Sequence, residues 1–383
     1  MKNAHTLTIK RPDDWHLHLR DGEMLKAVLP FSAELYGRAV VMPNLNPPLR
    51  TIRDIEAYRR RIMNALPPDH GFSPLMTLYL TDQTPVSELR EGKKAGLISA
   101  VKLYPVGATT NAEHGVTDLH KVYPVFEAMQ AMNIPLSIHG EISDPDVDIF
   151  DREVVFIERV LDPLRRDFPE LKMILEHVTS KTGVAYVQAA EKKLAATITP
   201  HHLRLERNHI FSKGINPHMY CLPIAKRADD RRAVRTAAVS GDRRFFFGSD
   251  SAPHLVVDKE KSGGAAGIFN SPTAIAHAAR IFEEERALQH FETFVALNGA
   301  AFYELAPNKD TITLKKSNEA LKPLETIAAG AGRVKVFQTG DPIYWYVARG
   351  LRPASVADGE QHECCCSQSA DNQRFFGYYK QDE

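Results

Sequence analysis

Asp14-Trp15-His16-Leu17-His18-Leu19-Arg20 places two histidines and an arginine at the end of the first strand-like segment of the chain. Side chains two positions apart on a β-strand point to the same side, so His16 and His18 can hold one metal ion from a single strand. Leu17 and Leu19 then face the other side, which is typical of a strand buried on both faces. Arg20 shares the parity of the two histidines and can reach a substrate anion beside the metal.

Short apolar or β-branched runs alternate with helical patterns along the first 250 residues. Apolar residues recur at spacings of three and four in residues 52–66, 119–132 and 152–164, which indicates helices. Strand and helix in alternation predict a parallel sheet, and eight strands favour a closed (β/α)8 barrel of the metal-dependent hydrolase type. No GxGxxG follows the first strand, which argues against a dinucleotide-binding fold. The eight predicted strands are residues 7–10 (leading into the His-x-His), 39–42, 75–80, 99–103, 135–138, 172–175, 195–198 and 244–247.

Two connections in this pattern are long, and long loops in compact domains are usually functional or disordered. They are the polar loop 104–117 after the fourth strand and residues 200–226 after the seventh, which lack periodicity. Helices are predicted over 272–285 and 288–305, followed by strand-like pieces at 311–315, 333–337 and 343–347 that pack outside the barrel. We therefore expect one unit over 1–348 and a disordered tail over 349–383, where Cys364-Cys365-Cys366 lie.

The composition excludes several classes of partner. Lys and Arg number 48 and Asp and Glu also 48, so no net charge favours nucleic acid or an anionic membrane. No apolar run is long enough to span a bilayer, and the first residues lack the apolar core of a signal peptide. Cys221 is alone within the first 360 residues, so the chain has no disulfide framework, and a cytoplasmic location is expected.

Ligand-type residues end several of the predicted strands. Barrel enzymes keep their chemistry at the carboxyl ends of the strands. Four imidazoles and one carboxylate suit zinc, and they are too many for one tetrahedral ion that keeps an open position. They suit two ions that share a bridge. These strand-end residues are His16, His18, His139, His177 and Asp250, with Lys102 at the end of the fourth strand.

Lys102 is the unusual member of this set. As an ammonium it cannot ligate a metal, and an isolated lysine at a strand end usually extends its charge to solvent. Beside two divalent ions, the neutral amine could instead add carbon dioxide and give a carbamate with one oxygen for each metal. With ligand residues at four other strand ends, the carbamate is the better interpretation.

Several motifs together resemble the amidohydrolase superfamily and, within it, the dihydroorotases of the short bacterial type. The resemblance covers roughly residues 7–305 and continues more loosely to about 347. The matching motifs are residues 11–21, Val41-Met42-Pro43-Asn44, Lys102-Leu103-Tyr104-Pro105, Glu176-His177 and Gly248-Ser249-Asp250-Ser251-Ala252-Pro253-His254.

The resemblance implies two zinc ions per subunit. One is held by His16, His18, carboxylated Lys102 and Asp250, and the other by the same carbamate with His139 and His177. It further implies a hydroxide between the ions, Asp250 as general base and acid, and a homodimer. The implied reaction is the reversible cyclisation of N-carbamoyl-L-aspartate to (S)-dihydroorotate in pyrimidine synthesis.

The resemblance also implies a set of substrate contacts. The carboxylate is held by Arg20, Asn44 and His254. Backbone groups near Leu222, Ala266 and Gly267 meet the amide edge of the ring, and Thr109 and Thr110 lie on a mobile loop over the substrate. The chemistry agrees, because a cyclic amide with a carboxylate needs an electrophile for its carbonyl, a water-derived nucleophile and an anion clamp.

Three alternatives remain at this point. Another cyclic amidase of the superfamily, such as a hydantoinase or allantoinase, shares the binuclear site, but Arg20 and His254 argue against a neutral ring as substrate. A mononuclear deaminase of the superfamily does not need Lys102. A catalytically inactive assembly partner typically loses metal ligands, whereas all six positions are filled here.

Overall fold

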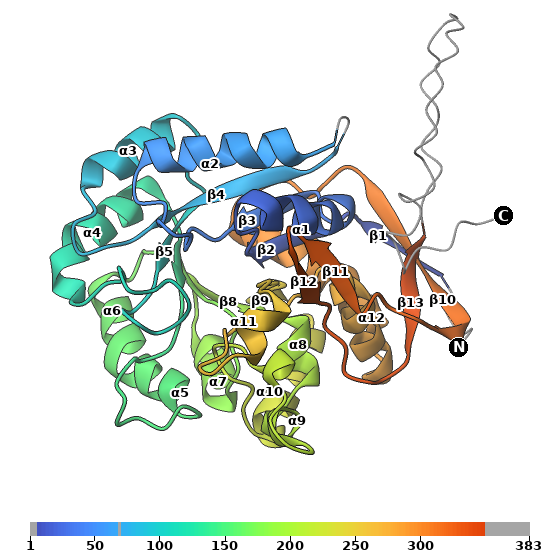
Figure 1. The fold of residues 1–383 in the computed structure, drawn as a ribbon. Helices are drawn as coiled ribbons and strands as arrows, with labels where there is room; N and C mark the ends of the chain where they lie inside the picture. Colours follow the sequence, from blue (N-terminus) through green and yellow to red (C-terminus); the bar gives the residue numbers. More distant parts are fainter. Residues whose placement is uncertain (1–5, 68–69, 349–383) are drawn as a thin grey trace, which may run out of the picture.

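Eight parallel strands form the centre of the molecule in the computed structural model, which describes residues 6–67 and 70–348 (Figure 1). Each strand pairs with the next one along the chain. At the carboxyl end, Asp250 N donates to His16 O at 2.8 Å and His18 N donates to Ser251 O at 3.1 Å, which joins the last strand to the first. The predicted (β/α)8 barrel is thereby confirmed as a nearly closed barrel. Its strands are β2 (Asp13–Leu17), β3 (Arg38–Val41), β4 (Ser73–Tyr79), β5 (Ala100–Leu103), β6 (Leu136–Ile138), β7 (Met173–Leu175), β8 (Leu194–Ile198) and β9 (Phe245–Phe247).

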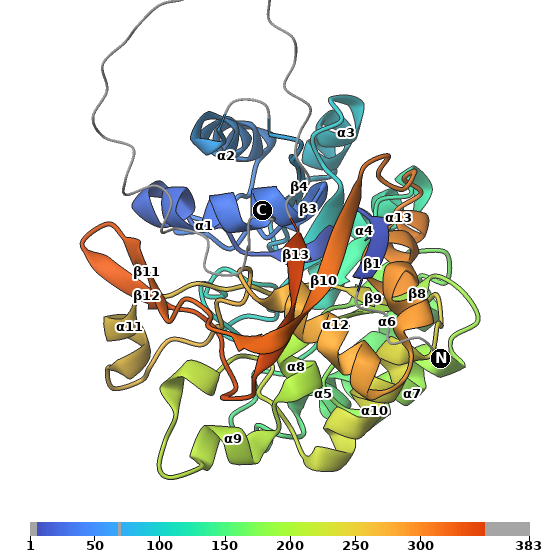
Figure 2. The ribbon, with the colours of Figure 1, turned by 90° about the vertical axis from the view of Figure 1, so that its right-hand side faces the viewer.

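Helices surround the barrel on its outside (Figures 1 and 2). The segment predicted over 152–164 is α5 and α6 joined by a π-helical turn, Ile157–Leu161. Within 200–226, where the sequence shows no periodicity, the structure contains α8 and α9, each too short for an amphipathic repeat to be visible. The helices are α1 (Gly22–Leu35), α2 (Ile52–Ala65), α3 (Val86–Lys94), α4 (Tyr123–Met132), α5 (Arg152–Phe156), α6 (Asp162–Asp167), α7 (Lys181–Ala189), α8 (Pro200–Arg204), α9 (Arg207–Phe211), α10 (Ala228–Val239), α11 (Val256–Glu260), α12 (Ala274–Glu284) and α13 (Asn298–Phe302).

Local sequence explains why α2 begins where it does and which face it buries. The Thr51 hydroxyl accepts from the Asp54 backbone N–H, and the Asp54 carboxylate accepts from that of Thr51, which is a capping box. Ile55, Tyr58 and Ile62 then recur at spacings of three and four and are fully buried. The helix therefore lies with one apolar face against the barrel and its charged face outward.

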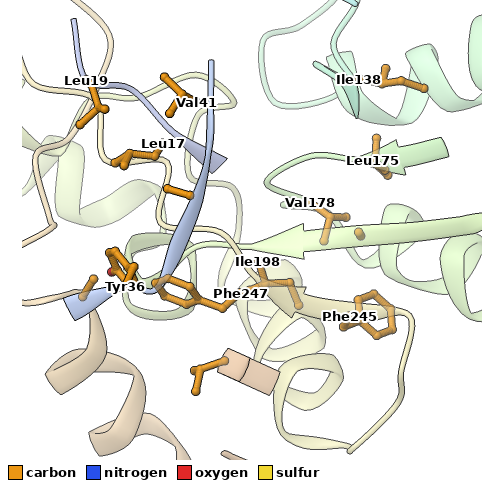
Figure 3. Packing of buried hydrophobic residues seen from close by; sticks show 14 of the residues in the cluster. Leu17, Leu19, Tyr36, Val41, Ile138, Leu175, Val178, Ile198, Phe245 and Phe247 are labelled. Atoms are coloured by element: carbon orange, nitrogen blue, oxygen red, sulfur yellow. The ribbon is translucent and has the colours of Figure 1, made fainter. Parts of the chain in front are cut away.

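Side chains along the barrel strands point alternately outward and inward, which separates two layers of apolar packing. Outward-facing side chains such as Val41, Leu175 and Phe247 fill the space between strands and helices (Figure 3). Their neighbours Ile174 and Phe246 belong to a separate cluster that also contains Trp15, Val40, Met42, Ala195 and Ala300. Because successive strand residues point to opposite faces, this second cluster fills the barrel interior. The carboxyl ends of the strands are left for polar residues.

The predicted first strand, residues 7–10, is not part of the barrel. It is β1 (Thr6–Lys10), which pairs antiparallel with β10 (Thr311–Leu321), itself paired with β13 (Ile343–Ala348) (Figure 2). The physical difference is burial: β2 is buried at all five positions, as a barrel strand must be, whereas in β1 only Ile9 is buried. The count of eight still holds, because the His-x-His segment itself supplies the first barrel strand.

The remaining strands form a small hairpin outside the barrel. It consists of β11 (Thr326–Ala329) and β12 (Gly332–Lys335), and Val334 pairs with Leu255 just before α11. Among the described residues, no helix is both long and apolar enough to cross a membrane. The predicted disordered tail, 349–383, lies outside the described residues.

Candidate functional site

The predicted ligand residues meet at the carboxyl end of the barrel. His16 lies in β2 and Lys102 in β5, and His18 and His139 follow directly after β2 and β6. His177 and Asp250 lie two and three residues beyond the ends of β7 and β9. A cavity is lined by these four histidines and Asp250, together with Arg20, Asn44, Tyr104, Thr109, Thr110, Leu222, Ala252, Ala266 and Gly267. Residues from seven segments of the chain thus share one site.

His16, His18 and Asp250 point their ligand atoms at one another. The two Nε2 atoms are 3.3 Å apart, and Asp250 Oδ1 lies 3.1 Å from His18 Nε2 and 3.5 Å from His16 Nε2. All three side chains are at least nine-tenths buried. Burial lowers the pKa of His18 to about 3, so its imidazole is neutral. Two imidazoles and a carboxylate that converge in this way are a donor set for a divalent metal ion.

Lys102 lies fully buried beside this group. Its Nζ has no hydrogen-bond partner among the described residues and is 5.0 Å from the centre of the Tyr104 ring. Burial lowers the pKa of this amine to about 8, although Glu176 and Asp250 oppose the change. A buried ammonium without a partner is costly. The structure therefore presents an amine that is easily neutralised and that lacks a group to complete its surroundings.

His139 and His177 form the other side of the group. Their ring centres are 4.9 Å apart, and the ring of His177 is 5.0 Å from that of His16. His177 Nδ1 has no partner among the described residues. Burial, followed by the neighbouring His139 and His16, holds the pKa of His177 well below its ordinary value. Its Nδ1 therefore shares no proton with a carboxylate of the described residues, and the ring is available as a neutral ligand.

Two buried carboxylates that the sequence analysis did not assign orient these histidines. Glu176 Oε2 lies 2.8 Å from His16 Nδ1, and Glu176 also accepts from the hydroxyls of Ser137 and Thr197. Glu141 Oε2 lies 2.9 Å from His139 Nε2. A carboxylate on one ring nitrogen fixes the tautomer and turns the other nitrogen toward the site. Glu141 had a sequence signal, since it follows its partner His139 by two residues, whereas Glu176 adjoins His177 in the chain but contacts His16 on another strand.

Arg20 and His254 form a basic corner of the site. Arg20 Nε donates to Pro253 O at 3.1 Å, and its Nη2 lies 3.0 Å from His254 Nε2, which is also 2.9 Å from Ala266 O. Burial and then the charge of Arg20 lower the pKa of His254 to about 2, so the imidazole is neutral. The guanidinium therefore supplies a positive charge in this corner, and its Coulombic partner in the structure is Asp250.

The predicted loop lies over the cavity. Asn44 Nδ2 donates to Thr110 O at 2.9 Å, and Asn111 Nδ2 donates to Asn44 O at 2.9 Å. Across the cavity, the Thr110 hydroxyl donates to Ala266 O at 3.3 Å. Tyr79 holds the far side of the loop through Asn111 O at 3.1 Å. The loop thus reaches from the end of β3 to the segment after β9.

Comparison with known proteins agrees with this geometry. The amidohydrolase family model matches residues 13–317. A dihydroorotase of Chelativorans sp. (strain BNC1) is 53% identical over 342 residues, which are 89% of this chain and 99% of the relative. The chain belongs to the dihydroorotases of the amidohydrolase family. The crystal structure of the Saccharomyces cerevisiae dihydroorotase in complex with 5-fluoroorotic acid has a TM-score of 0.82 and 34% identity, covering 90% of this chain and 98% of that one.

A second solved dihydroorotase, from Campylobacter jejuni, has a TM-score of 0.81 and 36% identity and covers 89% of this chain and 97% of that one. The resemblance predicted from the sequence motifs is confirmed. The dihydroorotase family is metal-dependent, and the described residues contain candidate ligand groups at the expected strand ends.

The backbone at this dihydroorotase-family site is bent at three of the predicted residues. Arg20, His177 and Asp250 have φ values of +56°, +42° and +42°. Such left-handed conformations are uncommon for residues other than glycine and cost of order 1–3 kcal/mol each. The surrounding fold maintains them, and they turn side chains from strand ends toward the cavity.

Another group of potential ligand residues lies outside the set predicted from the sequence. His201, His202 and Cys221 are buried within ligand distance of one another. However, His202 Nε2 is 2.8 Å from Pro223 O and must donate, so its Nδ1 accepts from Thr199. His201 Nδ1 accepts from Asn270, which places the proton on Nε2. Burial raises the pKa of the Cys221 thiol to about 12. The available lone pairs are already used, so this group is a hydrogen-bonded core and not a second metal site.

Proposed function

We propose that the protein catalyses the reversible cyclisation of N-carbamoyl-L-aspartate to (S)-dihydroorotate and water, a step of de novo pyrimidine (UMP) synthesis. The observation that carries this proposal is one cavity that joins a ligand group for metal ions to a basic corner for a carboxylate. The relatives support the same activity, because proteins named dihydroorotase match nearly the whole length of the unit that we expect over 1–348.

The residues present fit two metal ions, which we propose to be zinc. His16, His18 and Asp250 converge on one point, and Lys102 Nζ and His177 Nδ1 are buried without partners among the described residues. Carboxylated Lys102 would complete the first set and would share the second with His139 and His177. When bound, the ions supply polarisation of the substrate carbonyl and a water whose pKa is lowered toward neutrality.

Asp250 provides the proton transfers in this proposal. Although burial opposes its ionisation, the neighbouring His16 and the hydrogen bond from His18 hold the pKa of its carboxyl below the ordinary value. Asp250 is therefore a carboxylate at neutral pH and can accept a proton from the attacking water. In ring opening it returns that proton to the leaving amide nitrogen, and in ring closure it acts in the reverse order.

The basic corner orients the substrate. Arg20 offers a planar, permanently charged fork to the substrate carboxylate, and Asn44 and the neutral His254 add polar contacts beside it. Leu222, Ala266 and Gly267 line the wall where the amide edge of the ring would lie. A neutral hydantoin or allantoin ring would leave the half-buried guanidinium without a substrate anion, which disfavours these alternative substrates.

The decisive assay measures ring opening of dihydroorotate by the purified protein, with bound metal counted in the same sample and hydantoin and allantoin as competing substrates. Turnover of dihydroorotate with two metals per chain is expected. Metal without turnover of dihydroorotate would contradict the function, and absence of both would favour an inactive assembly partner. We further propose a cytoplasmic homodimer that acts on a small molecule without nucleic acid or membrane partners, which size-exclusion chromatography with light scattering would check for the dimer.

The equilibrium should depend steeply on pH. Ring opening converts a neutral amide into a carboxylate and releases one proton, so the ratio of carbamoyl aspartate to dihydroorotate should rise about tenfold per pH unit. Hydrolysis would need the metal-bound water deprotonated as well as Asp250 ionised, so its rate should rise toward alkaline pH, whereas ring closure needs that proton in place and should be fastest on the acidic side. The measurement is a pair of rate profiles in the same buffers. If the rates of ring opening and ring closure both rose with pH, the same proton could not serve both directions.

The loop over the cavity should affect turnover without affecting metal binding. Replacing Thr109 and Thr110 together with glycine removes the hydroxyl that reaches Ala266 O and loosens the segment that Asn44 holds. Turnover should fall because a lid excludes water and completes the site, while metal content stays unchanged. The control is Thr117→Gly on the same loop, whose hydroxyl bonds to Asp82 on the outer side. Equal losses in both variants would show a general loop defect instead.

A further inference from the structure

Lys259 is a buried lysine outside the group of predicted site residues. It lies in α11 and is 5% exposed, and among the described residues none of the carboxylates pairs with it. Charged lysines are almost never so deeply buried without a partner. Its Nζ instead donates to two backbone carbonyls, Tyr220 O at 2.7 Å and Gly267 O at 2.6 Å. The Lys259 side chain therefore serves as a hydrogen-bond donor to these two carbonyl oxygens.

The two carbonyls belong to the two loop segments that form one wall of the cavity. Tyr220 precedes Leu222 by two residues, and Gly267 and Leu222 both line the cavity. The segments also touch directly, because Gly267 N donates to Tyr220 O at 3.1 Å. Lys259 therefore fastens the loop after β8 to the loop after β9 at the point where they meet.

The segment that Lys259 holds has little freedom on its other side. Gly267 has a φ of +148°, and a Cβ there would lie 2.7 Å from Ala252 O and 2.9 Å from His254 Cδ2. Ala266 O contacts His254 Nε2 at 2.9 Å. A displacement of Gly267 would therefore carry Ala266 and disturb His254 in the basic corner.

We propose that Lys259 is a positioning residue for substrate binding, which holds the backbone wall formed by the Leu222 and Ala266–Gly267 segments in place to receive the ring amide. The inference rests on the proposed function, since that wall is assigned there to the ring. Lys259 acts through the two carbonyls, and among the described residues no hydrogen bond or ion pair joins it to a proposed metal ligand. Its loss should weaken binding of the ring and leave the metals and the proton transfers in place.

The test compares Lys259→Met with Lys259→Arg in steady-state kinetics on dihydroorotate. Methionine keeps the length of the side chain but donates no hydrogen bond, and a neighbouring cavity of about 450 Å³, which Lys259 lines, gives it room. Misplacing a binding group by about 1 Å can cost on the order of a hundredfold. We expect Lys259→Met to raise KM about tenfold to a hundredfold with a much smaller change in kcat and unchanged metal content. Lys259→Arg, which keeps donors, should recover most of the loss.

The matched control is Lys261→Met, which removes an exposed lysine two residues away that pairs with Asp258. It should leave KM and kcat unchanged. An unchanged KM in Lys259→Met would overturn the proposal, and so would an arginine variant as impaired as the methionine variant. If Lys259→Met does not fold, Lys259→Gln takes its place in the same comparison. If the wild-type protein does not open dihydroorotate at all, the proposed function fails instead, and the two failures are thus distinguishable.

Discussion

Replacing Lys102 with alanine should abolish most of the activity and release at least one metal ion. The side chain is fully buried, and in the proposed site its carbamate is the group that both ion sites share. Even the loss of a residue that only supports a metal ligand costs about 10–100-fold in metal affinity or activity, so loss of the shared ligand should exceed this range. Metal analysis by plasma mass spectrometry and the ring-opening rate, measured on one preparation, check the prediction.

Lys172→Ala is the control for this variant. Lys172 precedes β7, at the opposite end of the barrel from the site, and pairs with Glu304. Its replacement should lower thermal stability slightly and leave metal content and rate unchanged. A Lys102→Ala protein that retains two metals and a near-normal rate would refute the carbamate.

Arg20→Met should strongly lower kcat/KM for dihydroorotate while the metal content stays unchanged. The guanidinium is the half-buried positive charge of the basic corner. Truncating one partner of a hydrogen-bonded charge pair that the substrate would bury costs about 2–5 kcal/mol. At about 1.4 kcal/mol for each factor of ten, kcat/KM should fall by roughly 30-fold to several thousandfold. Methionine has a Cβ like arginine, so the left-handed backbone at this position costs the two residues alike.

The control is Arg61→Met, which removes an exposed ion pair with Asp21 close to the same segment. Such surface ion pairs contribute little to stability, so the kinetics of Arg61→Met should match those of the wild-type protein. A fully metallated Arg20→Met protein with unchanged kinetics would show that the substrate carboxylate binds elsewhere.

The sequence predicted the parts of the site that follow from strand periodicity and chain order. Parity along one strand brought His16 and His18 together, and alternation of strands and helices placed Lys102, His139 and Asp250 at one end of a barrel. These are local rules that hold wherever a parallel barrel closes. The same alternation does not explain the direction of Arg20. The strand β2 ends at Leu17, and the left-handed backbone of Arg20 itself sets the direction of its side chain.

The groups that the sequence did not reveal depend on tertiary contacts. Glu176 and Glu141 could be read as neighbours of histidines, but which ring nitrogen each carboxylate meets is decided by how separate strands pack. Lys259 gave no signal, since a lysine in a short helix is usually exposed. The tail over 349–383 and its three cysteines remain a prediction, because they lie outside the described residues.

The outer sheet has a consequence for how the chain folds during synthesis. In this sheet Leu7 pairs with Leu314, so β1 has no partner until more than three hundred further residues have been made. Contacts of such long sequence separation form late, because the entropy of closing the intervening chain must be lost first. The strand β1 is therefore expected to stay unpaired and exposed through most of translation. A ribosome-bound chain that ends before β10 should be protease-sensitive at its amino end.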